Sequence, residues 1–257
     1  MSLPLSVTVI TLNEERNLDR CLASVQGLAR EIVVVDSGST DRTGEIAAAH
    51  GARFVYNRWQ GFNAQRVFGE QHCQQPWVLA LDADEVLSDE LRTAIAAALG
   101  RDGPQAGYRF SRRTFYLGAW IWHVWYPEWR LRLYRRDRAS WVGEEPHGRC
   151  EVQGPVERLP GDLLHYSFRN LSEHLNKTLS YARTSALAQY QRGKRFSGLR
   201  MLLSPGFRVF RDLVLKSGWR DGWRGVAIAM IGGYSSFAKQ AFLYEAGLEA
   251  DDPARKP

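Results

Sequence analysis

The sequence predicts an α/β fold with a mostly parallel central sheet, helices on both faces of that sheet, and a C-terminal helical region. Within residues 1–85, four short apolar segments, the first of them rich in β-branched residues, alternate with segments of helical periodicity. Strands that are apolar on both sides are typical of a parallel sheet that is covered on both faces. From Asn170 onward the pattern is helical. We therefore expect two domains, residues 1–168 and residues 169–257.

The elements of the first half follow one another in a regular order. The predicted strands are residues 5–12, 32–35, 53–56 and 77–81. The predicted helices are residues 18–25, 42–50, 63–73 and 88–99. Asp41 can cap the second helix, and Gly51 is well placed to end it. Strands and helices in this order indicate parallel strands joined by right-handed crossovers.

Polar residues follow three of these strands, at the point where each strand ends. They are Asn13 and Glu14, Asp36 and Ser37, and Asp82 and Asp84. Because ligands of such sheets bind beyond the carboxyl ends of the strands, we expect all three groups to face one crevice.

Asp82 and Asp84 are two residues apart, so an extended chain would point both carboxylates to the same side. Two such oxygen ligands suit Mg²⁺ or Mn²⁺ bound together with substrate phosphates. The alternative is an acidic helix start, because Ser88 and a helical pattern follow closely. The sequence contains neither GxGxxG after the first strand nor GxxxxGK[ST], which disfavours a dinucleotide dehydrogenase and a P-loop NTPase.

Composition narrows the class of protein further. The 257 residues suit one large domain, or a catalytic domain with an appended subdomain, and the net charge of +6 suggests an anionic partner. Cys21, Cys73 and Cys150 are far apart, which indicates neither a zinc site nor a disulfide framework and favours a reducing cytosol. We expect no signal peptide and no membrane-spanning helix, because no apolar run is long enough.

The middle of the chain is predicted to add strands at residues 108–115, 131–134 and 163–166. The aromatic residues between Trp120 and Trp129 suit stacking on sugar rings or a subdomain core equally well. Residues 141–149 are expected to form a loop that carries Glu144, Glu145 and His147.

The last third is basic and amphipathic. Beyond Pro205, the side chains of Phe207, Phe210, Leu213 and Val214 share a helical face among arginines, and Trp219 and Trp223 follow. This pattern suits binding to an anionic membrane surface. The alternative is a helix that packs its apolar face on the domain and leaves its charges in water.

Three motifs taken together resemble glycosyltransferase family 2. They are Val9–Glu15, Val33–Asp41 and Leu81–Glu85. Further segments are similar to the lipopolysaccharide inner-core β-1,4-glucosyltransferase branch: Trp59–Phe62 with Gln65-Arg66, Trp125–Tyr134, Leu164–Tyr166 and Gly218–Gly222. The resemblance implies a GT-A nucleotide-diphospho-sugar transferase fold and an inverting, metal-dependent transfer from a nucleotide sugar.

The resemblance also implies roles for single residues. Thr11, Asn13, Glu14 and Ser37 would line the nucleotide pocket, Asp36 would accept from the N3–H of uracil, and Asp41 would hold the loop. Asp84 would bind the metal on the diphosphate, and Asp82 would contact the ribose or the metal. Arg66 can add a second positive group. His165 is either a third metal ligand or a core histidine whose ring is satisfied by the backbone.

Inversion requires a base that removes the proton of the acceptor hydroxyl. Members of this branch carry an acid after Tyr-Pro, here Glu128, and a His-Glu pair downstream. This chain departs from the second motif, because Gly148 follows His147. Glu128 is the predicted base, with Glu145 or Glu144 as substitutes. The alternatives are an ion pair of Glu128 with Arg130 or Arg132, and a solvated loop for Glu144 and Glu145.

The function expected from the sequence is that of a hexosyltransferase. It would move a sugar, glucose favoured, from a UDP-sugar to a lipopolysaccharide inner-core or other membrane glycolipid acceptor. The enzyme would be cytoplasmic and peripheral at the inner face of the cytoplasmic membrane. The departure at Gly148 motivates a non-catalytic nucleotide-sugar-binding protein as an alternative. A nucleic-acid-binding module would not explain the crevice, so we expect no nucleic-acid partner.

Overall fold

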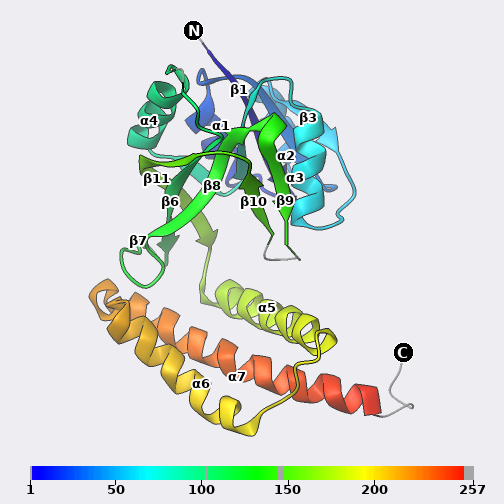
Figure 1. The fold of residues 1–257 in the computed structure, drawn as a ribbon, viewed down its shortest axis with the longest axis vertical. Coiled ribbons are helices and arrows are strands. Elements are labelled where there is room, and N and C mark those ends of the chain that lie inside the picture. The colour runs from blue at the N-terminus through cyan, green and yellow to red at the C-terminus, as the bar shows by residue number, and fades with distance from the viewer. Residues whose placement is uncertain (1, 102, 144–147, 252–257) are drawn as a thin grey trace. The chain divides into compact units, whose positions relative to one another are not determined.

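The structure is a computed structural model, which describes residues 2–101, 103–143 and 148–251 (Figure 1). The strands are β1 Leu3–Thr11, β2 Ala29–Asp36, β3 Arg53–Tyr56, β4 Trp77–Asp82, β5 Glu85–Leu87, β6 Gly107–Tyr116, β7 Ala119–Trp120, β8 Glu128–Arg135, β9 Ala139–Val142, β10 Arg149–Val152 and β11 Val156–Phe168. The helices are α1 Leu18–Val25, α2 Thr43–Ala49, α3 Phe62–Gln71, α4 Asp89–Leu99, α5 Leu171–Gln191, α6 Gly198–Phe210 and α7 Trp223–Asp251.

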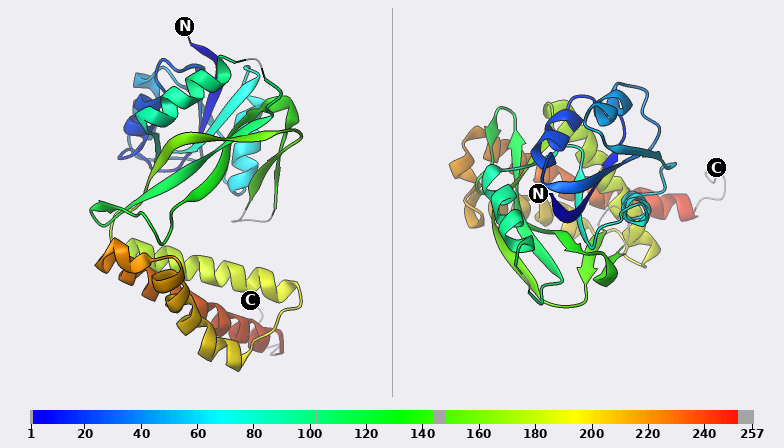
Figure 2. Two further views of the ribbon diagram at one scale, coloured as in Figure 1. Left: turned by 60° about the vertical axis from the view of Figure 1, so that its left-hand side comes forward. Right: turned by 90° about the horizontal axis from the view of Figure 1, so that it is seen from above.

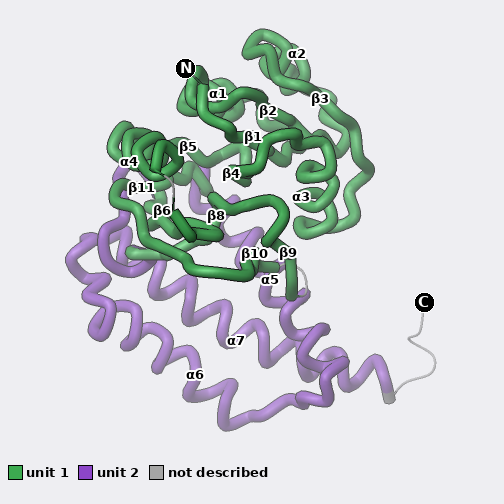
Figure 3. The backbone as a smooth tube through the Cα atoms, turned by 45° about the horizontal axis from the view of Figure 1, so that its top comes forward, with its two compact units in different colours: residues 1–114, 127–167 green, residues 115–126, 168–257 purple. Residues whose placement is uncertain are grey.

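The chain divides into two compact units, which are coloured separately in Figure 3. Unit 1 comprises residues 1–114 and 127–167, and unit 2 comprises residues 115–126 and 168–257. The structure groups residues 115–126 with the second unit, whereas the sequence analysis places them in the first. Trp125 explains the grouping, because its ring packs against Tyr116, Phe168 and His174 of unit 2.

The sheet of unit 1 has the strand order β3-β2-β1-β4-β8-β6-β11-β5. Strands β3, β2, β1 and β4 are parallel to one another, as predicted for the first half of the chain. An antiparallel extension then begins, because β8 pairs antiparallel with both β4 and β6. The twist of the sheet is visible in the two further views (Figure 2). The predicted α/β fold with a parallel core is confirmed.

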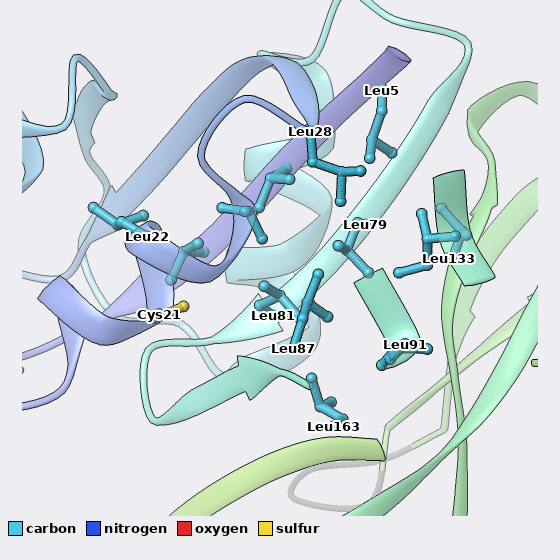
Figure 4. Close-up of a cluster of buried hydrophobic side chains, with 14 of the residues drawn as sticks. Leu5, Cys21, Leu22, Leu28, Leu79, Leu81, Leu87, Leu91, Leu133 and Leu163 are labelled. Atoms are coloured by element: carbon cyan, nitrogen blue, oxygen red, sulfur yellow. The ribbon is translucent and has the colours of Figure 1, made fainter. Parts of the chain in front are cut away.

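Helices cover both faces of this sheet. On one face, α1 and α4 contribute apolar side chains such as Leu22 and Leu91 to the buried cluster that also contains Leu79 of β4 (Figure 4). On the other face, Phe62 and Phe68 of α3 pack on Val33 and Val78. Since helices fill both faces, the carboxyl edge of the parallel strands is the part of unit 1 where polar side chains can gather.

Strand β1 lies between β2 and β4, while the chain runs from β1 to β2 and β3 before it returns to β4. The order of strands therefore reverses beside β1. A ligand crevice is expected beyond the carboxyl ends of the strands at such a reversal.

One expectation for the middle of the chain is wrong, and a predicted strand is present but longer than expected. Residues 141–149 do not form one loop, because Trp141 and Val142 end β9 and Arg149 begins β10, which pairs with β9 as an antiparallel hairpin. The strand predicted at residues 163–166 extends over the whole of β11, and Gly161, with a φ of +86°, lies within it.

In unit 2, the long helix α7 packs against both α5 and α6. Asp221 fixes the segment 115–126 to this unit, because its carboxylate accepts from the backbone N–H groups of Trp122, His123 and Val124. No helix in the described part of the chain is both long enough and apolar enough to cross a bilayer.

The three cysteines are free and buried. Burial raises the pKa of the Cys73 thiol to about 12, and it does the same for the pKa of Cys150. Burial also raises the pKa of Cys21 well above its usual value, and the nearby Glu85 adds to the shift. The free thiols agree with a sequence that indicates no disulfide framework.

Candidate active site

The loop that follows β2 is built around Asp36, which is almost completely buried. Its Oδ2 accepts from the backbone N–H groups of Gly38 (2.8 Å) and Ser39 (2.7 Å). Its Oδ1 accepts from the hydroxyls of Thr11 (3.0 Å) and Ser39. Asp36 therefore organises its own loop, and four donors already occupy its oxygens. Its predicted acceptance of a uracil N–H stays a prediction.

The loop after β1 is tied to the same segment. Asn13 adopts a φ of +55°, and its backbone N–H donates to Ser39 Oγ at 2.7 Å. The Asn13 side chain accepts from the backbone N–H of Thr40 at 2.9 Å. The backbone N–H of Glu14 donates to the hydroxyl of Thr43 at 2.9 Å. Asn13 and Glu14 thus follow the carboxyl end of β1 and are hydrogen-bonded to the segment after β2, and their place in a nucleotide pocket stays a prediction.

Asp41 closes the connection between the two loops. Its Oδ2 accepts from the backbone N–H of Glu15 at 3.0 Å, and its Oδ1 accepts from the backbone N–H of Thr43 at 3.0 Å. Burial alone would raise the pKa of Asp41, but the donors from Thr43 and Glu15 lower it below its usual value. These bonds fit its predicted role in holding the loop.

Ser37, the residue after Asp36, is held from α3. Its Oγ accepts from Nε2 of the fully buried Gln65 at 2.8 Å, and Gln65 also binds the carbonyl of Asn57 at 2.8 Å. Ser37 therefore lies at the carboxyl end of β2, and Gln65 of α3 holds its hydroxyl oxygen in place.

Asp82 is the last residue of β4 and lies between two arginines. Its Oδ1 accepts from Arg66 Nη2 at 2.6 Å, and its Oδ2 accepts from Arg132 Nη2 at 2.8 Å. Burial would raise the pKa of Asp82, but the charges of Arg132 and Arg66 hold it far below its usual range. Because both oxygens face guanidinium groups, the metal-ligand role of Asp82 stays a prediction.

Asp84 lies in the turn between β4 and β5 rather than in an extended strand. Period-two alternation therefore does not apply, and the expectation that both carboxylates point to one side through an extended chain is wrong. Asp84 Oδ2 lies 3.4 Å from His165 Nε2, while Asp82 faces Arg66 and Arg132. The pairing of β5 with β11 brings His165 opposite Glu85, the neighbour of Asp84.

The pair of Asp84 and His165 fits a divalent cation in its donor chemistry. The 3.4 Å separation is longer than a normal hydrogen bond of about 2.7–3.2 Å. Burial would raise the pKa of Asp84, but His165 lowers it, so the carboxylate is ionised. Within the described residues, no group of three or more His, Cys, Asp or Glu side chains could hold an ion alone. A bound ion would need substrate oxygens to complete its shell.

Glu85 holds the turn that carries both aspartates. It is completely buried, and its Oε2 accepts from the backbone N–H of Asp82 at 3.0 Å. Its Oε1 accepts from Arg112 Nη1 and Arg132 Nη2, each at 3.3 Å. One carboxylate thereby fixes the backbone of the turn to the buried Arg132 and the partly buried Arg112.

Glu128 begins β8, and it pairs with two arginines. Arg112 Nη2 lies 2.8 Å from Glu128 Oε2, and Arg130 donates to Glu128 Oε1. Burial would raise the pKa of Glu128, but Arg112 and Arg130 lower it. The ion-pair alternative is confirmed for Arg130, whereas Arg132 pairs with Asp82 and Glu85 instead.

Some guanidinium N–H groups of the site have no acceptor among the described residues. Arg66, Arg130 and Arg132 each have a buried Nε–H without a hydrogen-bond partner among the described residues. Burial lowers the pKa of Arg130, and the neighbouring charge of Arg112 lowers it further. An arginine destabilised by burial and like charge favours an added anion.

Sequence reasoning missed Glu85, Arg112 and Arg132 as parts of the site. A signal was present in β8, where Glu128, Arg130 and Arg132 alternate with Trp129 and Leu131, so the three charges share one face of the strand. Arg112 could not be found from sequence alone, because it reaches Glu128 only through the antiparallel register of β6 and β8.

Three residues of the predicted site, Glu144, Glu145 and His147, lie outside the described residues. Gly148 is described, and a Cβ atom there would lie 1.8 Å from Asn63 Oδ1. The side chain of Asn63 therefore fills the space that a larger residue at position 148 would need. A larger residue at this position would require the Asn63 side chain to move.

The sequence matches the family model described as glycosyl transferase family 2 over residues 6–157. The lipopolysaccharide core biosynthesis glycosyltransferase LpsC of Rhizobium meliloti (strain 1021) is 33% identical over 255 residues, which cover 95% of this chain and 93% of LpsC. An uncharacterised glycosyltransferase of Rickettsia typhi is 29% identical and covers 96% of this chain and 88% of its own length.

A solved structure of S. aureus TarS, residues 1–349, resembles this chain with a TM-score of 0.49 and 15% identity, over 94% of this chain and 91% of that one. So low a TM-score adds nothing to the assignment. The sequence matches are sufficient, because the family model covers more than half of the chain and LpsC aligns over nearly all of it. This protein therefore belongs to glycosyl transferase family 2 and is a glycosyltransferase.

Proposed function

We propose that the protein transfers a sugar, glucose favoured, from a UDP-sugar to a lipopolysaccharide inner-core or other membrane glycolipid acceptor, with inversion at the anomeric carbon. The observation that carries the proposal is the pairing of Asp84 with His165 beside arginines whose N–H groups lack acceptors among the described residues. A divalent cation would bind the Asp84–His165 pair, and a diphosphate would accept from the arginine N–H groups.

Asp84 and His165 would hold the ion, Mg²⁺ or Mn²⁺. When bound, the ion neutralises charge that develops on the leaving diphosphate. Arg66 provides a second positive group in the same crevice, and its guanidinium is already held in place by Asp82. Because these groups are fixed before substrate binds, little reorganisation is needed during the reaction.

Glu128 would accept the proton of the attacking acceptor hydroxyl. Arg112 and Arg130 keep its carboxylate ionised, which a general base requires. They also make it a weak base, because a lowered pKa reduces its affinity for the proton. Glu144 and Glu145 remain the substitutes if Glu128 serves only as an ion-pair partner.

The acceptor class rests on similarity to LpsC, whose name assigns it to lipopolysaccharide core biosynthesis. The match covers nearly the whole of both chains, so it includes unit 2 as well as the catalytic unit. A lipid-linked acceptor places the reaction at a membrane, here the inner face of the cytoplasmic membrane.

Residues 169–257 support membrane association through α6. None of the side chains of α6 is buried, and Leu199, Leu202 and Phe207 expose 68%, 76% and 63% of their surface. Apolar residues recur along one stripe of the helix, at positions 199, 202, 203, 207 and 210. Exposed apolar patches of this kind mark interaction sites.

The charge around this stripe is positive. Between Arg192 and Arg220, Asp212 is the only acid, and it is buried against Arg208 and Arg211. Arg200, Lys216 and Arg220 are exposed. We therefore propose that α6 binds an anionic lipid surface, because such a surface accepts both the apolar stripe and the surrounding cations.

The proposed reaction is tested with Asp84→Asn. UDP release from UDP-glucose, measured with Mg²⁺ or Mn²⁺ and a core-oligosaccharide acceptor, should fall by ~10²-fold or more, because the ion loses a charged ligand. The exposed Asp89 of α4 gives the matched control, and Asp89→Asn should retain full activity. Full activity of Asp84→Asn would exclude the metal role of Asp84.

Binding measurements beside this assay separate the alternatives. UDP binding without turnover on any acceptor would favour a non-catalytic nucleotide-sugar-binding protein. Failure to bind any UDP-sugar, together with salt-sensitive binding of DNA or RNA, would favour a nucleic-acid-binding module.

A further inference from the structure

Arg66 is held by contacts with several parts of unit 1. It lies on α3 and is buried, and its Nη2 contacts Asp82 at 2.6 Å. Its Nε–H has no acceptor among the described residues. An arginine that is held at one nitrogen and unsatisfied at another, inside the crevice, is prepared to receive an anion.

The guanidinium of Arg66 is also covered by an aromatic ring of the β9–β10 hairpin. Its Cζ lies 4.8 Å from the centroid of the Trp141 ring, which is a cation–π distance. The ring restricts the plane of the guanidinium, and the packing of α3 on β9 keeps the two side chains together. A stacked guanidinium loses less freedom when it binds a phosphate.

Trp141 is itself fixed by Glu70. Its Nε1–H donates to Glu70 Oε1, and the Tyr134 hydroxyl donates to the same oxygen. Glu70 is one helical turn after Arg66 on α3, so the two residues share a face of the helix. Helix α3 therefore carries both Arg66 and Glu70. Glu70 orients the Trp141 ring, and that ring covers the Arg66 guanidinium.

We propose that Trp141 and Glu70 are positioning residues for Arg66, and that the ligand of Arg66 is the diphosphate of the nucleotide sugar. This inference rests on the proposed function. It extends that function, because it makes the β9–β10 hairpin part of the machinery that recognises the leaving group. Neither residue needs to touch the substrate.

The test compares UDP with UMP, measured by calorimetry in the presence of Mn²⁺. Arg66→Ala should weaken UDP binding by ~10-fold relative to UMP, since one arginine–phosphate contact is lost. Trp141→Ala and Glu70→Leu should lower the same UDP-to-UMP affinity ratio by a similar factor. Glu70→Gln should preserve the ratio, because its side-chain carbonyl still accepts from Trp141 and Tyr134.

A double variant separates positioning from general damage. If Trp141 acts through Arg66, then Arg66→Ala with Trp141→Ala should show no greater loss of the ratio than Arg66→Ala alone. Thermal melting identifies variants that fail to fold. If Trp141→Ala is one of them, Trp141→Phe replaces it, because phenylalanine keeps an aromatic face but loses the N–H. The UDP-to-UMP affinity ratio should then fall by ~3-fold.

Two failures are distinguishable. A wild-type protein that binds neither UDP nor UMP contradicts the proposed function and this inference with it. In the other case, the wild-type protein binds UDP while the UDP-to-UMP ratio is unchanged in the folded Trp141 variants, or while the losses in the double variant are additive. Either result overturns only the role of Trp141 and Glu70.

Discussion

Glu128 shows how single charges in the site regulate one another. Arg112 and Arg130 flank its carboxylate and lower its pKa against the opposing effect of burial. A general base works only when it is deprotonated, so activity that depends on Glu128 is lost as the pH falls through this lowered pKa. Both arginines therefore protect the ionised form in mildly acidic solution.

The first prediction at the residue scale is a pH profile. For the wild type, kcat/KM should stay flat from neutral into mildly acidic pH. In Arg112→Gln, burial remains while one opposing charge is lost, so the pKa of Glu128 rises and the acid limb moves to higher pH. Arg101→Gln, on an exposed arginine beyond α4, is the control and should leave the profile unchanged. An acid limb that stays in place in Arg112→Gln would indicate a different base.

Sequence patterns placed the first components of the candidate site because these residues follow strand ends. Asp36, Asp82 and Asp84 could be placed from the apolar segments that precede them. The partners of these acids could not, since Arg66 reaches Asp82 from α3 and Arg132 reaches it from β8. Such contacts depend on the packing of α3 and on the pairing of β4 with β8, which periodicity along one segment does not encode.

At the scale of elements, β11 depends on one glycine. Gly161 has a φ of +86°, and a Cβ atom there would lie 2.3 Å from the backbone nitrogen of Leu91. The first turn of α4 thus approaches the bend of β11 at a distance that only glycine permits. The same strand carries His165 to the turn of Asp84, so this contact also supports the site.

Gly161→Ala should destabilise the protein by more than the ~1–3 kcal/mol of an unfavourable φ alone, because the methyl group also meets backbone atoms. Gly51→Ala is the matched control: Gly51 has a φ of +67°, but a methyl group at this position would meet no atom within 4 Å. Thermal or urea unfolding should show the larger loss of stability for Gly161→Ala. Equal losses would mean that α4 moves away without cost.

For the whole molecule, the proposed membrane surface of α6 makes a prediction about location. Sedimentation with vesicles should show binding to phosphatidylglycerol and much weaker binding to phosphatidylcholine, because the exposed charges around the stripe are cationic. Leu202→Ser and Phe207→Ser should each weaken vesicle binding by ~10-fold, the loss expected when one large apolar side chain no longer inserts.

Phe54→Ser is the control for that experiment, because Phe54 is also a half-exposed apolar residue but lies on β3 of unit 1. Its vesicle binding should equal that of the wild type. If the α6 variants bind vesicles as tightly as Phe54→Ser does, the stripe has another partner. A second copy of the chain is then the first candidate partner to test, by ultracentrifugation.

The three buried thiols have a practical consequence for measuring how the two units are arranged in solution. Their raised pKa values leave almost no thiolate at neutral pH, and burial keeps reagents away from them. Cysteines introduced at exposed positions can therefore carry maleimide dyes or nitroxide spin labels while Cys21, Cys73 and Cys150 stay native. With one label in each unit, the distance between the two labels can be measured spectroscopically with and without UDP.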